Sequence, residues 1–124
     1  MRQASVILID VPGLLGAIVR DLVDAAPGLR IAAEYPIGVE PVEAVTETGA
    51  DFVIMNAKPG WEREIGALMR RHPRVRALGL AADGRTGTVY ELRPHARRLG
   101  DLTPEVLLGA IRAEPSWTPA QRGS

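Results

Sequence analysis

Three polar residues with complementary chemistry follow two apolar runs of the sequence. Asp10 ends the run at residues 5–9, Asn56 ends the run at residues 51–55, and Lys58 comes two positions later. A carboxylate and an ammonium group at one place can form an ion pair, whereas a carboxylate beside an amide can contact a cation or a polar ligand. Two alternatives are therefore open: a structural Asp10–Lys58 pair or a residual ligand site.

Strand-like and helix-like patterns alternate along the chain and must position these residues. The predicted strands cover residues 5–9, 29–33, 51–55 and 75–80, and the predicted helices cover residues 14–23, 40–48, 61–72 and 103–113. This alternation predicts a three-layer α/β/α sandwich with a parallel sheet. Because the carboxyl ends of parallel strands share one edge, we expect any site to form there.

Residues 83–100 break the regular pattern, since they include Gly84, Gly87, Pro94 and Gly100. Glycine and proline disfavour a helix. One alternative is a turn at residues 83–87, after which residues 88–93 return antiparallel to the fourth strand. The other alternative is a short, distorted helix.

Taken in order, these segments resemble the receiver domain of two-component response regulators. The resemblance covers residues 4–113 and is carried by residues 6–10 with Leu14-Leu15, by residues 51–56, by residues 72–78 and by residues 102–111. It implies a flavodoxin-like receiver fold with sheet order 2-1-3-4-5, in which the fourth helix is lost and the last strand is either parallel or antiparallel. Residues 1–113 then form the domain, and residues 114–124 are a flexible tail.

The sequence departs from the receiver pattern at the functional positions. Receivers place two acids after the first strand, a phosphoacceptor aspartate after the third, a hydroxyl after the fourth and a lysine after the fifth. Here Val11 follows Asp10, and Asn56, Ala81 and Gly100 occupy the other three positions. An uncharged amide is a very poor nucleophile, so the resemblance implies no phosphotransfer and no bound metal. The degenerate phosphorylation pocket comprises Asp10, Val11, Asn56, Lys58, Ala81 and Gly100.

Composition excludes several other classes of protein. The chain has 124 residues, 46% hydrophobic and 24% charged, with a net charge of zero, as expected of one globular domain. It has no cysteine, two histidines and no recognisable nucleotide-binding or catalytic motif, so we expect no cofactor and no enzymatic activity. Basic residues are scattered and aromatic residues are few, which argues against direct nucleic-acid binding. No apolar run is long enough to span a membrane, and a cytoplasmic location is expected.

Four further positions have open alternatives. Trp61 either covers the pocket mouth or packs at the start of its helix, and His72 is expected to cap a helix end rather than to act in catalysis. His95 is expected in a loop, either solvated or in contact with a phosphate. Residues 88–92 are predicted to form an edge strand. Tyr90 and Leu92 are either the candidate interface of a homodimer or residues that pack in the core.

The sequence as a whole predicts a phosphorylation-independent pseudo-receiver that acts as a signalling or protein-interaction module. Its partner would be another protein or a second copy of the chain. The alternative is a small-molecule or nucleotide-binding domain that uses the pocket around Asp10, Asn56 and Lys58.

Overall fold

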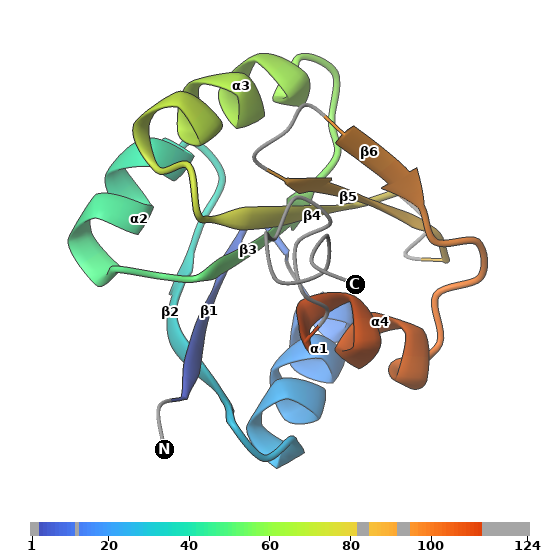
Figure 1. Ribbon diagram of the computed structural model, residues 1–124. Coiled ribbons are helices and arrows are strands. Elements are labelled where there is room, and N and C mark those ends of the chain that lie inside the picture. The colour runs from blue at the N-terminus through green and yellow to red at the C-terminus, as the bar shows by residue number, and fades with distance from the viewer. Residues whose placement is uncertain (1–2, 12, 82–84, 92–94, 113–124) are drawn as a thin grey trace, which may run out of the picture.

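The computed structural model describes residues 3–11, 13–81, 85–91 and 95–112 (Figure 1). The strands are β1 (Ala4–Ile9), β2 (Leu29–Tyr35), β3 (Phe52–Asn56), β4 (Arg76–Leu80), β5 (Gly87–Glu91) and β6 (His95–Arg98). The helices are α1 (Gly13–Ala25), α2 (Pro41–Thr48), α3 (Trp61–Arg71) and α4 (Pro104–Arg112). Leu92, the predicted domain boundary at residue 113 and the predicted tail at residues 114–124 lie outside the described residues.

The strands form one sheet in the order β2-β1-β3-β4-β5-β6. β1 pairs in parallel with β2 and β3, and β3 pairs in parallel with β4, whereas β5 is antiparallel to both β4 and β6. The predicted α/β fold and the order 2-1-3-4-5 are confirmed. Within the described residues the chain passes from β4 to β5 without a helix, so the antiparallel alternative is the correct one.

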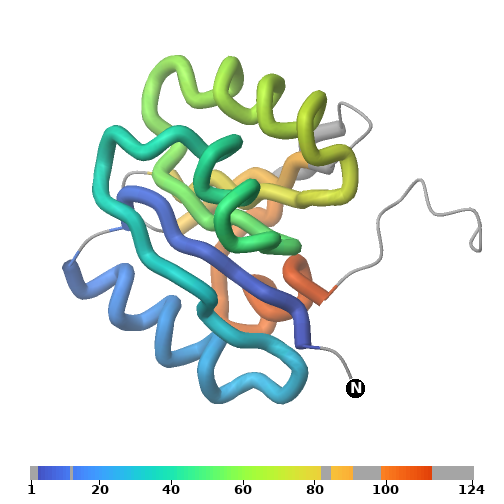
Figure 2. The backbone as a smooth tube through the Cα atoms, turned by 90° about the vertical axis from the view of Figure 1, so that its left-hand side faces the viewer, coloured from blue at the N-terminus to red at the C-terminus, as the bar shows by residue number. Residues whose placement is uncertain are grey.

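Two helices cover each face of the sheet, which gives the three predicted layers (Figures 1 and 2). Alternate residues of β1 show the division: Val6 and Leu8 belong to the core with α1 and α4, whereas Ile7 and Ile9 belong to the core with α2 and α3. Such strands are apolar at most positions because helices cover both of their faces. None of the helices in the described ranges is long and apolar enough to cross a membrane.

Arg76, at the start of β4, fastens the last helix to the sheet. Its guanidinium group donates hydrogen bonds to the carbonyl oxygens of Ala110, at 2.9 Å, and of Ile111, both in the last turn of α4. The same group lies 5.1 Å from the centre of the Phe52 ring. A cation at a helix C-terminus satisfies carbonyl groups that have no partner within the helix.

Trp61 joins β4 to β5 on the side of α2 and α3. Its indole ring occupies the space that a Cβ atom on Gly79 would need, so β4 can approach the ring only because residue 79 is glycine. The ring also meets Tyr90 edge to face, with centroids 4.9 Å apart and planes at 88°. Trp61 is 5% exposed, which makes it a core residue at the start of α3 rather than a cover for a pocket.

The expected edge strand and the candidate interface need correction. β5 is hydrogen-bonded on both sides, to β4 and to β6, so it is not at the edge of the sheet. Tyr90 is half-buried and packs against the core on the side of α2 and α3. His95 begins β6 rather than lying in a loop, and it is β6 that ends the sheet.

Candidate functional site

Asp10 is held at the carboxyl end of β1 in an unusual backbone conformation. Its φ angle is 57°, in the left-handed region, and it is the one non-glycine residue with a positive φ among the described residues. Aspartate tolerates this region better than most residues, because its short polar side chain can hydrogen-bond locally. The backbone N–H of Asp10 donates a hydrogen bond to the Tyr35 carbonyl at 2.9 Å, which anchors the turn to the end of β2.

Lys58 pairs with this carboxylate, which is the first of the two alternatives that the sequence leaves open. The lysine Nζ lies 3.7 Å from Oδ2 of Asp10, and the two side chains are 37% and 16% exposed. The loop after β3 is fixed on both sides of Lys58: the N–H of Ala57 donates to the Leu80 carbonyl, and the N–H of Trp61 donates to the Lys58 carbonyl. The ammonium group is therefore placed by backbone hydrogen bonds as well as by charge.

Asn56 is the last residue of β3 and lies at the same level of the sheet as Asp10. The register of the parallel strands pairs Ile9 with Met55, so the residues that follow them are neighbours at the strand ends. Asn56 is half-buried. Its amide can donate and accept hydrogen bonds, but it cannot act as the nucleophile that a carboxylate would provide.

The remaining predicted pocket residues divide into two groups. Ala81 follows β4 at this same edge, where its N–H donates to the Thr86 carbonyl and where it provides no side-chain hydroxyl. Gly100 follows β6, and β5 lies between β6 and β4. At the usual spacing of strands, β6 is roughly 10 Å from β4. The predicted pocket is thus shared by the ends of β1, β3 and β4, while the position expected for the lysine is two strands away.

Val11 contributes to the site through its backbone. Its side chain is half-buried and packs against the core on the side of α1 and α4. Its carbonyl group lies where a Cβ atom on Gly16 would be, so α1 can begin this close to the strand end only with glycine at that position. Gly16 supports the site, and the sequence reading did not single it out.

The opposite charges of Asp10 and Lys58 compensate each other at this edge of the sheet. Asp10 supplies one carboxylate, Lys58 neutralises it, and Asn56 adds an uncharged amide. Within the described residues there is no group of three or more histidine, cysteine, aspartate or glutamate residues that could hold a metal ion. The arrangement can hydrogen-bond a small polar group.

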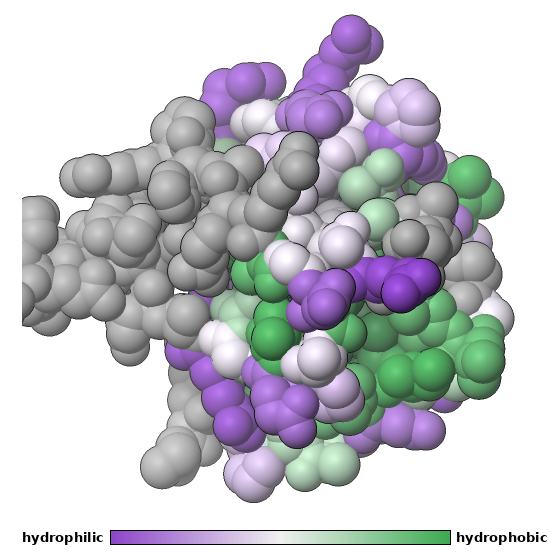
Figure 3. All heavy atoms as spheres, turned by 90° about the vertical axis from the view of Figure 1, so that its right-hand side faces the viewer, coloured by the Kyte–Doolittle hydropathy of each residue, from purple (hydrophilic) through white to green (hydrophobic). Residues whose placement is uncertain are grey.

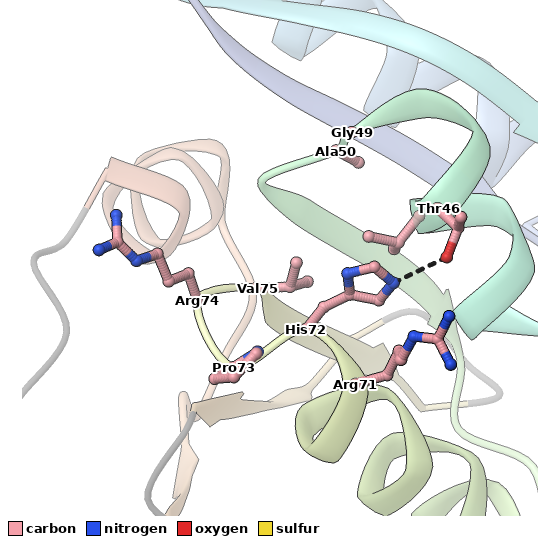
Figure 4. Close-up of a pocket in the computed structure, with 9 residues that line it drawn as sticks. Thr46, Gly49, Ala50, Arg71, His72, Pro73, Arg74 and Val75 are labelled. Atoms are coloured by element: carbon pink, nitrogen blue, oxygen red, sulfur yellow. Dashed lines mark hydrogen bonds between the residues drawn. The ribbon is translucent and has the colours of Figure 1, made fainter.

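A hollow of about 530 Å³ lies at the opposite edge of the sheet, between the C-terminal ends of α2 and α3 (Figure 4). His72 is the C-terminal cap of α3, as expected, and its ring Nε2 lies 2.9 Å from Oγ1 of Thr46 in α2. The Thr46 hydroxyl donates to the Val42 carbonyl, so Nε2 of His72 is the donor in the contact between them. Figure 4 shows the Arg74 side chain pointing away from the hollow. The hydrogen bond between His72 and Thr46 joins the end of α3 to α2.

Comparisons with known proteins identify no family for the chain. No family model matches it, and no curated protein matches it. The fold and the geometry of the strand ends are therefore the observations from which a function can be inferred.

Proposed function

We propose that the protein is a receiver-like module that works without phosphorylation, through association with a protein partner or with a second copy of itself, in the cytoplasm. The observation that carries this proposal is the ion pair between Asp10 and Lys58. A receiver needs free carboxylates at this edge for a magnesium ion. Here the one carboxylate that follows β1 is already neutralised by a lysine of the same chain.

Two further features of the strand ends support the proposal. Asn56 replaces the carboxylate that would accept phosphate, and Ala81 replaces the hydroxyl that would bind it. In addition, β5 pairs antiparallel with β4, and the N–H of Ala81 donates to the Thr86 carbonyl. Each feature removes a different part of the machinery of phosphotransfer.

Incubation with acetyl phosphate and Mg²⁺ tests the proposal. The intact mass is expected to stay unchanged, while a phosphorylatable receiver treated in parallel gains one phosphate. Asn56→Asp is also expected to stay unmodified, because Lys58 still neutralises Asp10 and Ala81 still lacks a hydroxyl. A gain of one acid-labile phosphate by the wild-type protein would refute the proposal.

Self-association is tested by sedimentation over a range of concentrations. The exposed large apolar side chains in the described part of the chain are Leu14, Ile18 and Ile37. Leu14 and Ile18 lie one turn apart on α1, and Figure 3 shows an apolar area on the side of the molecule where α1 lies. If the protein forms a dimer through this surface, L14E/I18E becomes a monomer, whereas Ala25→Glu, an exposed position at the other end of α1, stays dimeric.

A small-molecule or nucleotide-binding domain is the second candidate, favoured by the half-buried Asn56 amide beside the ion pair. The amide and the partly exposed ammonium group could hydrogen-bond a polar ligand. A thermal-shift screen of nucleotides and small acids distinguishes the two functions. This candidate predicts a ligand-dependent rise in melting temperature that Lys58→Met abolishes, whereas the interaction module predicts no such rise.

A further inference from the structure

The edge of the sheet at β6 has a neighbouring strand on one side only, among the described residues. β6 is the last strand in the order, and β5 is the one described strand with which it pairs. In an antiparallel pair, alternate residues direct their N–H and C=O groups toward the neighbouring strand and the others direct them outward. In a strand of four residues, about two therefore have N–H and C=O groups that face away from β5. An added strand would form its hydrogen bonds with these groups. Figure 3 looks onto this side of the molecule.

The sequence of β6 is strongly basic. It reads His95-Ala96-Arg97-Arg98, and no acidic residue occurs between Glu91 and Asp101. The register sets Arg97 opposite Val89 and Arg98 opposite Thr88. Successive residues of a strand belong to opposite faces of the sheet, so each face of this edge has one arginine position.

This charge pattern selects the kind of strand that the edge can accept. Pairing of β6 with β6 of a second copy would bring two sets of arginines together, and like charges on neighbouring strands are destabilising. An extended segment with two consecutive acidic residues would instead place one carboxylate on each face. Charge thus disfavours self-pairing and favours an acidic strand.

We propose that β6 is a docking edge for an extended, acidic segment of a partner protein, which adds to the sheet as a seventh strand. This inference rests on the proposed function as an interaction module and specifies the partner of that module. Backbone hydrogen bonds would provide the affinity for the added strand, and the consecutive arginines Arg97 and Arg98 would select acidic sequences.

The probe is the peptide acetyl-Thr-Val-Glu-Glu-Val-Thr-amide, titrated into the full-length protein and followed by NMR. We expect the amide signals of residues 95–98 to shift, with weak binding that salt weakens further. Two control peptides separate the contributions. Lysines in place of the glutamates remove the charge match, and N-methylation of alternate peptide bonds removes the backbone donors, so neither peptide should bind.

A charge swap makes the test specific to β6. R97E/R98E is expected to bind the acidic peptide at least about tenfold more weakly than the wild-type protein does. It is also expected to bind the lysine peptide, because the charges of the cross-strand pairs are then reversed. Arg63→Glu, an exposed position on α3 with the same change of charge, should leave the affinity unchanged. Circular dichroism with the same melting temperature would show that the swapped variant is folded.

Three results would overturn the inference. The first is the absence of shifts at residues 95–98, and the second is equal binding of the N-methylated peptide, which would indicate attraction of charge alone. The third is tighter binding of oligothymidine than of the acidic peptide, which would make the edge a nucleic-acid surface. If the acidic peptide does not bind β6 but the mass is unchanged after acetyl phosphate treatment, the inference of an acidic partner is refuted and the proposed function still stands.

Discussion

The two halves of the sheet are built on different principles. In β1, β3 and β4, nearly every residue is buried between two layers of helices, and the strands run in parallel. In β5 and β6, neighbouring strands are also neighbours in the sequence and run antiparallel. The parallel half carries Asp10 and Asn56 at its strand ends, whereas the antiparallel half follows the alternative in which the strand after β4 turns back along it.

The two halves also place the candidate residues differently. Asp10 and Asn56 lie where the sequence predicts them, at the ends of adjacent strands. The position expected for the lysine, Gly100, is displaced because β5 lies between β4 and the next strand that runs in their direction. Asp10 and Asn56 are thus neighbours at the ends of β1 and β3, and Gly100 lies apart from them.

Trp61→Ala should have the largest effect, because this side chain connects the two halves. Its ring packs against Gly79 in β4 and against Tyr90 in β5. Loss of a buried tryptophan should lower the free energy of unfolding by about 3–5 kcal/mol. Chemical denaturation measures the loss, and hydrogen exchange should show faster exchange in β5 than in β1. Tyr90→Phe, which keeps the ring, serves as the control. Equal loosening of both halves would show that Trp61 does not join them.

Gly79→Ala should have the next largest effect. The added Cβ must displace the buried ring of Trp61, and overpacking of this kind costs about 1–3 kcal/mol. In a Trp61→Leu background the same substitution should cost much less, since the displaced ring is absent. A double-mutant cycle by chemical denaturation measures the coupling. Additive effects would contradict the contact described here.

Changes at Asp10 test the parallel half without touching the antiparallel one. Asp10→Ala should be less stable than Asp10→Gly by about 1–2 kcal/mol, because alanine resists the left-handed conformation and glycine does not. Asp10→Gly loses the ion pair, which for a partly exposed pair is worth up to about 1 kcal/mol, and also changes the backbone entropy of the unfolded chain. Equal stability of the alanine and glycine variants would mean that the left-handed turn is not maintained.

The smallest effect is expected at Tyr35, at the end of β2. Its hydroxyl donates to Oε1 of Glu47 at 2.9 Å, and burial together with this hydrogen bond raises the pKa of Tyr35 above 10.0. A raised pKa stabilises the fold while the hydroxyl is protonated, so the contribution is constant below pH 10 and declines as the pH rises through the raised value. Tyr35→Phe should lose about 0.5–1 kcal/mol near neutral pH.

Stability measured against pH for both proteins provides the check on Tyr35. The difference between wild type and Tyr35→Phe should be flat from neutral pH to pH 10 and should shrink above it. The exchange rates of β5 and β6 should be the same in both proteins, because Tyr35 belongs to the other end of the sheet. A difference that grows with increasing pH would contradict the assigned direction of the pKa.

The parallel half could be predicted because its signals are local. Residues 5–9 and 51–55 are continuous apolar runs, which is typical of strands covered on both faces. The pairing of Asp10 with Lys58 follows from their places after two such runs once the strands are adjacent. Helix ends were also predictable to within a few residues, as at Gly49, whose φ of 70° ends α2.

The antiparallel half was harder to predict because its signals depend on tertiary contacts. The segment His95–Arg98 has no apolar periodicity, and it is a strand because it continues the pairing that begins at β5. The interface alternative for Tyr90 assumed that β5 is an edge, which the pairing with β6 contradicts, and Tyr90 packs against the core as the other alternative has it. Gly79 did carry a signal, since glycine within a strand often marks a close approach, but the sequence does not reveal that Trp61 makes it.

The antiparallel arrangement of β4, β5 and β6 also affects the order in which the chain can fold. Pairing β1 with β3 must close a loop of more than 40 residues, whereas β4, β5 and β6 are joined by short connections. The entropy lost on closing a loop grows with its length, so the three C-terminal strands can meet at a lower entropic cost than the central ones. We expect early protection of amides in β4 and β5 during refolding, before the parallel strands that carry Asp10 and Asn56 have assembled. The part of the sheet that least resembles a receiver would then be the part that forms first.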